Sequence, residues 1–360
     1  MTARRFVFKL HRYTGLFVGL LLVLSGLSGS VLVFRDEIEA LAYPELLVTA
    51  AQGERVAVDE MLQAVRRAYP EDRPFAIRMP RTPQQTYLVK MNNAHDRFVY
   101  VDPYSGRILG AHRQVDSATG WVSLLHTELL LGEAGETALG IGGLLLTGLC
   151  VTGLVLWRPR NGKVSQGFKI QWTAHWKRAN FDLHRASGIY AVLFLSITAF
   201  TGVSLVFDKS AAGLIDAVTQ SPARTAPPLS GPPRAGMPMP SLDVLLQQAD
   251  RILPAAAITW INFPQTPRAP WVIRKKLPQE PHPNGRNFIY LDQYTGKVLQ
   301  VENTLEASLG TRISNGLYPT HIGVIGGTPT RILQVAVGLA PTVLFVTGFV
   351  MWKNRRNGKR

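Results

Sequence analysis

The chain of 360 residues contains a single cysteine, Cys150. One thiol cannot form an intramolecular disulfide, and the sequence has neither a Cys-x-x-Cys metal site nor a Cys-x-x-Cys-His motif for covalent haem attachment. Any metal centre must therefore use other ligands, and any haem must be held non-covalently.

Nucleotide-binding motifs are also missing. No G-x-G-x-x-G sequence lies between a strand and a helix, and there is no Walker loop. The chain should therefore neither bind NAD(P)H in a Rossmann domain nor hydrolyse ATP. Electrons for any redox reaction must come from another molecule.

Charged residues are absent from four long windows, at residues 13–34, 137–157, 186–207 and 332–352. Each window is long enough to cross a hydrocarbon layer of roughly 30 Å. The sequence therefore predicts an α-helical polytopic membrane protein with four transmembrane helices.

Lysine and arginine are concentrated at one end of each window, and most of the net charge of +15 lies there. The basic residues precede the first window, fill the loop between the second and third, and follow the fourth. Because short basic flanks stay in the cytoplasm, we predict a bacterial inner-membrane protein with both termini cytoplasmic. The charge is then explained by topology and contact with anionic membrane lipid, and no nucleic-acid partner is expected.

The resulting domain organisation alternates between membrane and aqueous segments. The expected boundaries are 1–34 for the cytoplasmic N-terminus and helix 1, 35–136 for periplasmic domain 1, 137–157 for helix 2, 158–185 for a cytoplasmic basic loop, 186–207 for helix 3, 208–331 for periplasmic domain 2 with a Pro-rich linker at 222–240, 332–352 for helix 4, and 353–360 for a cytoplasmic tail.

Nearly the whole sequence consists of two similar repeats. KLHRYTGL at residues 9–16 resembles DLHRASGIY at 182–190, and FVYVDPYSGRILG at 98–110 resembles FIYLDQYTGKVLQ at 288–300. The second window ends in TGLVLW and the fourth in TGFVMW. We therefore expect two tandem repeats, each with two spans and a small α+β periplasmic domain.

Each external segment has the same expected order of elements, an amphipathic helix followed by strands. The helices are expected at 58–69, capped near Asp59, and at 241–253, capped by Ser241. The expected strands are 76–79, 86–92 and 97–101 in the first segment, and 257–263, 271–275 and 287–291 in the second. Gly106 and Gly296 should supply the positive φ of a turn after the last strand.

Four of the eight histidines occupy corresponding places in the two repeats. His11 and His184 lie at the cytoplasmic ends of the first and third windows, and His126 and His321 lie just outside the second and fourth. A two-fold repeat would bring one pair together near each membrane face. Two imidazoles form a suitable axial set for a low-spin haem, although zinc or copper remains an alternative.

The surroundings of the inner histidines favour a haem. At helical spacing, His11 is aligned with Gly15, Gly19, Gly26 and Ser30, and His184 with Gly188, Ala191, Thr198 and Gly202. Small residues let helices, or a flat macrocycle, approach the backbone closely. Arg12 and Arg185 are candidate partners for haem propionates.

The pairing of the histidines stays open at this point. A cross pairing between the faces, or the use of His175 in the basic loop, is an alternative to the pairs suggested by the repeat. His95, His112 and His282 lie in external turns and are expected to be solvated.

In combination, LHRYTGL, DLHRASG, FRDE at 34–37, a histidine before each return span, TGLVLW followed by RPR, and the YVDPYSG turn resemble the PepSY-associated transmembrane family. Within it, the chain is similar to inner-membrane ferric siderophore reductases of the ferrioxamine type. The resemblance covers nearly the whole sequence. Tyr13 and Thr14, and Ala186 and Ser187, stand where many relatives have Trp and an aliphatic residue, which changes the packing expected around the macrocycle.

The resemblance implies a haem-dependent oxidoreductase with two non-covalent bis-His haem b groups per chain. It would carry electrons from the cytoplasmic side or the quinol pool to the periplasm, reduce an Fe(III)-siderophore and release Fe(II). The implied axial ligands are His11 and His184 on the inner side, and His126 and His321 on the outer. The electron donor stays open between quinol, a flavoprotein and a soluble reductant.

Two other readings compete with this one. The chain could be a non-redox regulator whose PepSY-like domains bind peptides or proteases, in which case its histidines are structural. It could also be a permease for metal or iron chelates, but the absence of ionisable residues inside the four windows argues against that.

Overall fold

The computed structural model describes residues 2–92, 97–158, 164–232 and 240–357. Parts of the Pro-rich linker, the basic loop and the C-terminal tail, together with His95, lie outside these ranges. The chain divides into two compact units. The helix unit comprises Met1–Phe34, Val122–Leu214 and Leu317–Arg360, and the sheet unit comprises Arg35–Trp121 and Ile215–Gly316.

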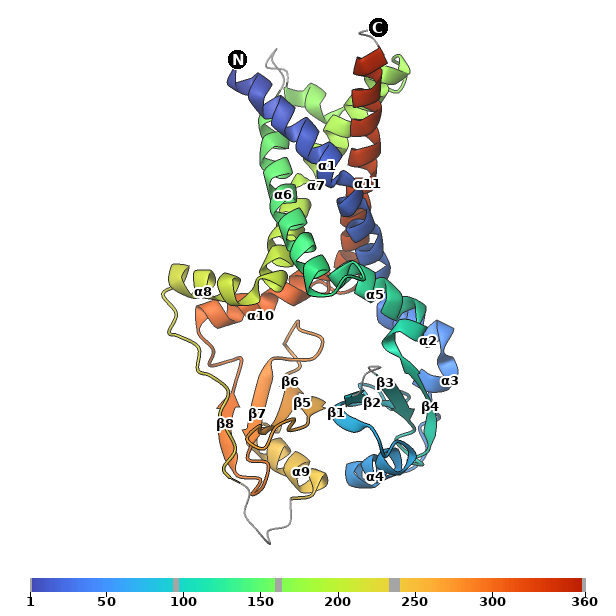
Figure 1. Ribbon diagram of the computed structural model, residues 1–360, viewed down its shortest axis with the longest axis vertical. Coiled ribbons are helices and arrows are strands. Elements are labelled where there is room, and N and C mark those ends of the chain that lie inside the picture. Colours follow the sequence, from blue (N-terminus) through green and yellow to red (C-terminus); the bar gives the residue numbers. More distant parts are fainter. Residues whose placement is uncertain (1, 93–96, 159–163, 233–239, 358–360) are drawn as a thin grey trace. The chain divides into compact units, whose positions relative to one another are not determined.

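Four long helices of the helix unit are apolar enough to cross a membrane. They are α1 (Ala3–Leu32), α6 (Glu133–Trp157), α7 (Trp176–Val206) and α11 (Thr328–Asn357), shown in Figure 1. Each extends beyond its uncharged window, and α7 begins ten residues earlier than expected because the His175 side chain caps it by accepting a bond from the Lys177 amide at 3.3 Å. The four predicted spans are therefore helices, and α1, α7 and α11 carry basic residues in a terminal turn.

The helices pack as a ring in which α1 and α7 each lie against α6 and α11. Small residues allow the closest approach, between α1 and α11, where a Cβ placed on Gly26 would lie 2.2 Å from the carbonyl oxygen of Gly338. Ser30 of α1 donates to the Val335 carbonyl of α11 at 3.2 Å. Part of the small-residue face expected on α1 thus serves helix packing.

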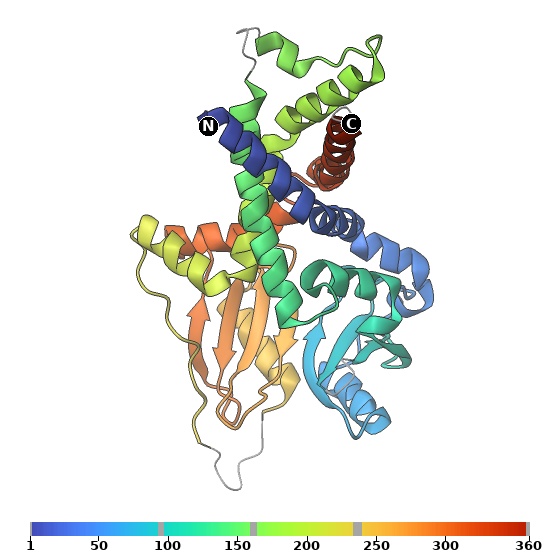
Figure 2. The same cartoon turned by 45° about the horizontal axis from the view of Figure 1, so that its top comes forward.

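The strands of both external segments form one antiparallel sheet in the order β4-β3-β2-β1-β5-β6-β7-β8. Its strands are β1 (Arg73–Arg78), β2 (Tyr87–Asn92), β3 (Arg97–Val101), β4 (Ile108–Arg113), β5 (Ala257–Asn262), β6 (Trp271–Lys276), β7 (Asn287–Leu291) and β8 (Val298–Glu302). Figure 2 shows the sheet from a second direction. The repeat predicts a separate small domain with three strands in each segment, whereas the structure has four strands from each segment in a single sheet. The difference arises because β1 and β5 would otherwise be open edges, and pairing with each other satisfies their backbone groups.

Helices α4 (Val58–Ala68) and α9 (Leu242–Ile252) cover one face of the sheet with a shared apolar core. A continuous row of side chains on this face is fully buried, namely Ile77, Val89, Val99, Ile261, Ile273 and Ile289. The row crosses from β3 to β7 without interruption, because Ile77 pairs with Ile261 at the seam between the halves. The two halves therefore share one core.

The two covering helices cap each other. Asp243 accepts bonds from the amides of Val58 at 3.0 Å and Asp59 at 3.1 Å, and Asp59 accepts one from the Asp243 amide at 3.1 Å. Ser241 caps α9 as expected, accepting from Val244 at 3.3 Å. Asp59, expected to cap its own helix, instead binds the amide end of its neighbour, where a negative charge is favoured.

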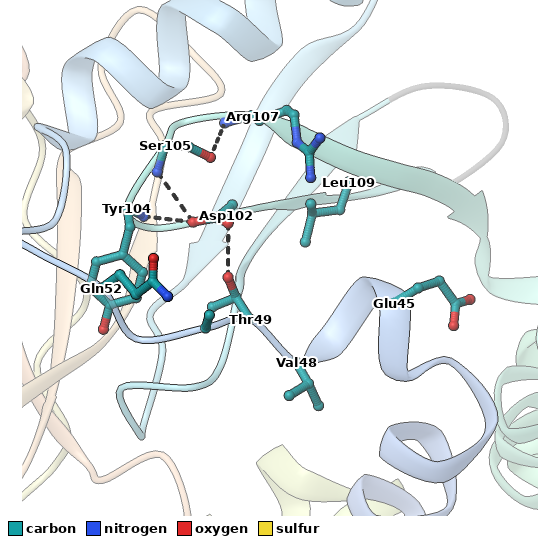
Figure 3. Close-up of a pocket in the computed structure, with 10 residues that line it drawn as sticks. Glu45, Val48, Thr49, Gln52, Asp102, Tyr104, Ser105, Arg107 and Leu109 are labelled. Atoms are coloured by element: carbon teal, nitrogen blue, oxygen red, sulfur yellow. Dashed lines mark hydrogen bonds between the residues drawn. The ribbon is translucent and has the colours of Figure 1, made fainter.

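The Asp-x-Tyr-Ser/Thr-Gly turns have the expected conformation, with a φ of 66° at Gly106 and 69° at Gly296. In the first turn, Asp102 accepts bonds from the Tyr104 amide at 2.7 Å, the Ser105 amide at 3.2 Å and the Thr49 hydroxyl at 2.8 Å. Figure 3 shows this turn beside an open pocket. Asp102 thus holds the turn and ties it to Thr49, which is a structural role.

The seam offers a test of the shared core. Replacing Ile261 with Ala should lower the free energy of unfolding of the sheet unit by about 2–5 kcal/mol, because it leaves a cavity in a fully buried row. Hydrogen exchange should quicken in α4 and α9 alike. Faster exchange confined to the second half would show instead that the halves are energetically separate.

Candidate functional site

The inner histidines lie side by side in the helix unit. His11 on α1 and His184 on α7 have ring centres 6.4 Å apart and ring planes at 89°. These two helices are not direct neighbours in the ring of four, so the imidazoles meet across its interior.

The outer histidines form a second pair. His126 lies on α5 (Ala118–Glu128) and His321 ends α10 (Leu309–His321), the short helices that precede α6 and α11. Their ring centres are 6.2 Å apart and their planes are tilted by 41°. The structure thus brings together the two pairs that the repeat suggests.

Every one of these rings binds a hydroxyl through Nδ1. The bonds are His11 to Thr152 at 2.9 Å, His184 to Thr347 at 2.8 Å, His126 to Ser28 at 3.1 Å, and His321 to Thr201 at 3.0 Å. Each hydroxyl donates its own proton to the carbonyl four residues earlier in its helix, at 2.6–2.9 Å.

This arrangement decides the tautomer of all four histidines. A hydroxyl has one proton, so a hydroxyl that donates to a carbonyl can only accept from the imidazole. Nδ1 must therefore carry the hydrogen in each ring, and His126 further donates to the Ser25 carbonyl at 3.0 Å. Nε2 is left as the lone-pair nitrogen, which is the form that binds a metal.

A glycine follows each hydroxyl residue and leaves room for the ring. A Cβ would lie 3.4 Å from Cε1 of His11 if placed on Gly153, and 3.4 Å from Cε1 of His184 if placed on Gly348. The corresponding distances are 2.8 Å from Gly29 to His126 and 3.1 Å from Gly202 to His321. Each imidazole therefore contacts a hydroxyl residue and the glycine that follows it on a neighbouring helix.

The ring separations match the spacing expected for two imidazoles that would bind one iron. A metal–imidazole bond of about 2.1 Å, with about 1.1 Å more from the nitrogen to the ring centre, gives about 6.4 Å between centres. The observed 6.4 and 6.2 Å agree with this spacing. The four histidines therefore fit a pair of bis-imidazole haems.

The two arginines next to the inner histidines have buried Nε atoms without a hydrogen-bond partner in the described part of the chain. Arg12 donates to the Tyr13 hydroxyl at 2.8 Å and stacks on that ring at 4.5 Å. Arg185 pairs at 2.9 Å with Asp182, which is completely buried, and also donates to the Gln166 carbonyl. The buried Nε–H of each arginine could therefore donate to a carboxylate such as a haem propionate.

A tetrahedral metal fits this chain less well. Among the described residues, no group of three or more His, Cys, Asp or Glu side chains could hold a metal ion. Zinc and copper sites in proteins normally use three or four such ligands, so two isolated imidazoles favour a haem.

The remaining described histidines have other partners. His175 caps α7 and stacks on Trp176 at 6.0 Å. His112 binds the Tyr100 hydroxyl at 2.9 Å, and His282 is only 7% exposed. The expectation of a solvated side chain is therefore wrong for His282, because the sheet unit packs basic side chains such as Arg274 against it, whereas His112 is half-buried.

Sequence reasoning missed the four hydroxyl residues, although a signal was present. Ser28 and Thr201 each lie seventeen residues after the inner histidine of their own helix. Thr152 and Thr347 each lie twenty-six residues after an outer histidine. Equal spacing of Ser/Thr-Gly pairs to histidines in both repeats would have identified them.

The two pairs are far apart along the bundle. Ser28, which binds His126, lies on the same helix as His11, and seventeen residues of α-helix rise about 25 Å. That distance is most of a hydrocarbon layer of about 30 Å. The arrangement places one candidate redox site near each end of the spans.

Comparison with known families supports a membrane protein. A family model described as the PepSY-associated TM region matches residues 8–355, which is nearly the whole chain. None of the curated proteins matches the sequence.

Proposed function

This chain belongs to the PepSY-associated TM family, and from its two histidine pairs we propose that it is a haem-containing inner-membrane reductase. It passes electrons from the cytoplasmic side or the quinol pool to the periplasm, where Fe(III) in a siderophore gains one electron and leaves as Fe(II). The observation that carries the proposal is the repeated set of imidazole, hydroxyl and glycine at both ends of one bundle.

The chain's own residues have definite roles in this function. Each hydroxyl holds its imidazole by Nδ1–H and leaves the Nε2 lone pair as the nitrogen that would bind iron. This outer hydrogen bond also increases the basicity of the ligating nitrogen. Bound haem b supplies a one-electron carrier that changes oxidation state with little change in shape.

Side chains between the two pairs exclude water and charge. Cys150, Leu195 and Val337 form a buried apolar cluster, joined by neighbours from α6, α7 and α11. A fixed apolar interior responds little when charge moves through it, which keeps the reorganisation cost of electron transfer low. Arg12 and Arg185 hold their unused donors at the inner end, where they would bind propionates and fix the orientation of the macrocycle.

The direction of transfer follows from the topology that we propose. Basic residues flank the ends of the spans near His11 and His184, so we assign this pair to the cytoplasmic side. The pair of His126 and His321 then faces the periplasm. Siderophore oxygens are hard donors that hold Fe(III) far better than Fe(II), so one electron is enough to release the metal.

A single preparation tests the proposal. Protein purified from haem-replete membranes should show b-type bands in a reduced-minus-oxidised spectrum, with two haems per chain. In proteoliposomes with an internal reductant, Fe(III)-desferrioxamine added outside should yield Fe(II), trapped by an external chelator. A folded but colourless protein would contradict the proposal and favour the non-redox regulator.

A further inference from the structure

The sheet unit has a second face, opposite α4 and α9, that carries basic and aromatic side chains. Arg78 on β1 is paired in register with Trp260 on β5, and the neighbouring Ala76 is paired with Lys90 on β2. Because side chains alternate along a strand, these residues point away from the face that Ile77 buries against the helices. The group therefore spans the seam between the halves of the sheet.

Cations and aromatic rings alternate across this face. The Lys90 ammonium lies 5.3 Å from the centre of the Phe98 ring and 5.1 Å from that of Trp260. Further along, the guanidinium groups of Arg274 and Arg286 lie 5.4 and 5.3 Å from the ring of Phe288. Rings of this kind exclude water, so the positive charge between them is weakly screened.

A neighbouring histidine reports the positive potential of this face. His282 lies close to Arg274, with ring nitrogens 3.3 Å from its guanidinium. Its burial, and then the charges of Arg274, Arg286, Lys276 and Arg81, lower its pKa to about 3. A second positive charge is strongly disfavoured here, whereas a negative one would be stabilised.

Arg78 is the cation on this face that lacks a partner. It makes no hydrogen bond or close ion pair with any residue that the structure describes, and burial lowers its pKa. The nearest carboxylates, Asp36 and Glu39, are already bound, Asp36 to Arg81 at 3.1 Å and Glu39 to Arg35 at 2.8 Å. Beside it, the indole N–H of Trp260 is buried and has no hydrogen-bond acceptor among the residues that the structure describes.

We propose that this part of the sheet binds the oxyanion of a soluble ligand, a carboxylate or a phosphate, with Arg78 as its principal contact. A guanidinium presents two parallel donors that match either group, and Lys90 supplies a second positive charge close by. The site lies outside the haem-binding set and needs no electron transfer, so the proposal is independent of the redox function.

Calorimetric titration of the full chain in detergent, with citrate and with inorganic phosphate in separate experiments, tests the site. At least one of the two should bind, and Arg78→Gln should weaken its binding by about tenfold or more, since a charge-assisted bond is lost. Arg66→Gln is the matched control, because it removes the same charge from an exposed position on α4, on the other face of the sheet. It should leave the affinity unchanged.

Two further measurements keep the outcome decisive. Arg78→Lys keeps the charge but loses the paired donors, so its affinity should lie between those of the wild type and Arg78→Gln, with an unchanged melting temperature. The proposal would be overturned if neither citrate nor phosphate binds, or if the wild type and Arg78→Gln bind with equal affinity. Binding only to nanodiscs of phosphatidylglycerol would overturn it as well, by making this face a lipid contact.

Discussion

Replacing His184 with Ala is expected to abolish the b-type absorbance of the inner site and to leave that of the outer site. The ring of His184 lies 6.4 Å from that of His11, and low-spin haem needs both nitrogens. The reduced-minus-oxidised spectrum of the purified variant should therefore keep about half of its b-type intensity. Replacing His321 should remove the other half, because His126 is its partner.

Two histidines of this chain serve as controls for that experiment. His112→Ala changes a residue bound to Tyr100 in the sheet unit, and His175→Ala removes the cap of α7 and a ring contact with Trp176. Both variants should keep the full spectrum. Loss of b-type bands in His175→Ala, or their full retention in His184→Ala, would show that the ligands are assigned wrongly.

Chemical rescue separates loss of a ligand from loss of the fold. His184→Gly leaves a space of imidazole size beside Thr347 and Gly348, the two residues that contact the ring in the wild type. Imidazole added in solution should restore low-spin bands in this variant. A misfolded protein would not respond, and neither would a site in which His184 has only a structural role.

The spans and the histidine positions could be predicted from the sequence because both depend on local patterns. An uncharged window of twenty residues has few alternatives to a membrane helix, and the repeated LHR sequence marks equivalent places in two such helices. The repeat suggested the pairing of His11 with His184, but it left a cross pairing and the use of His175 open, and only the packing of the helices decides between them. The turns at Gly106 and Gly296 were predictable for the same reason, since only the local backbone decides them.

The single sheet could not be predicted in this way. Pairing of β1 with β5 joins residues such as Ile77 and Ile261, which lie far apart in the sequence. Either half, read alone, has the alternation of a small complete domain. Neither pattern reveals that its first strand needs a partner from the other half. The exchange of caps between Asp59 and Asp243 was hidden for the same reason.

The orienting hydroxyls were missed because a threonine in a membrane helix has an ordinary explanation. Thr152 and Thr347 satisfy their hydroxyl protons within their own helices, as serine and threonine commonly do in apolar surroundings. In their second role, the same hydroxyl oxygens accept a hydrogen bond from an imidazole. That role appears only when the neighbouring helix brings a histidine to it.

The orienting role predicts a large effect from a very small change. Thr152→Val keeps the shape of the side chain but replaces the acceptor of the His11 Nδ1–H bond, 2.9 Å long, with a methyl group. Haem affinity at the inner site should fall by about 10–100-fold, the usual cost of losing such an outer bond. The measurement is the rate of haem transfer from the purified protein to an excess of apomyoglobin. Haem transfer from the outer site should keep its wild-type rate.

A second readout distinguishes orientation from simple packing. Without the hydroxyl acceptor, the His11 ring is a less basic ligand and stabilises Fe(III) less, so the reduction potential of the inner site should rise. Thr152→Ser keeps the oxygen and should keep both the affinity and the potential near wild type. Thr147→Val is the matched control, because this exposed threonine lies on the same helix and bonds only the Gly143 carbonyl, at 3.0 Å. If Thr147→Val and Thr152→Val have equal effects, the hydroxyl does not act through His11.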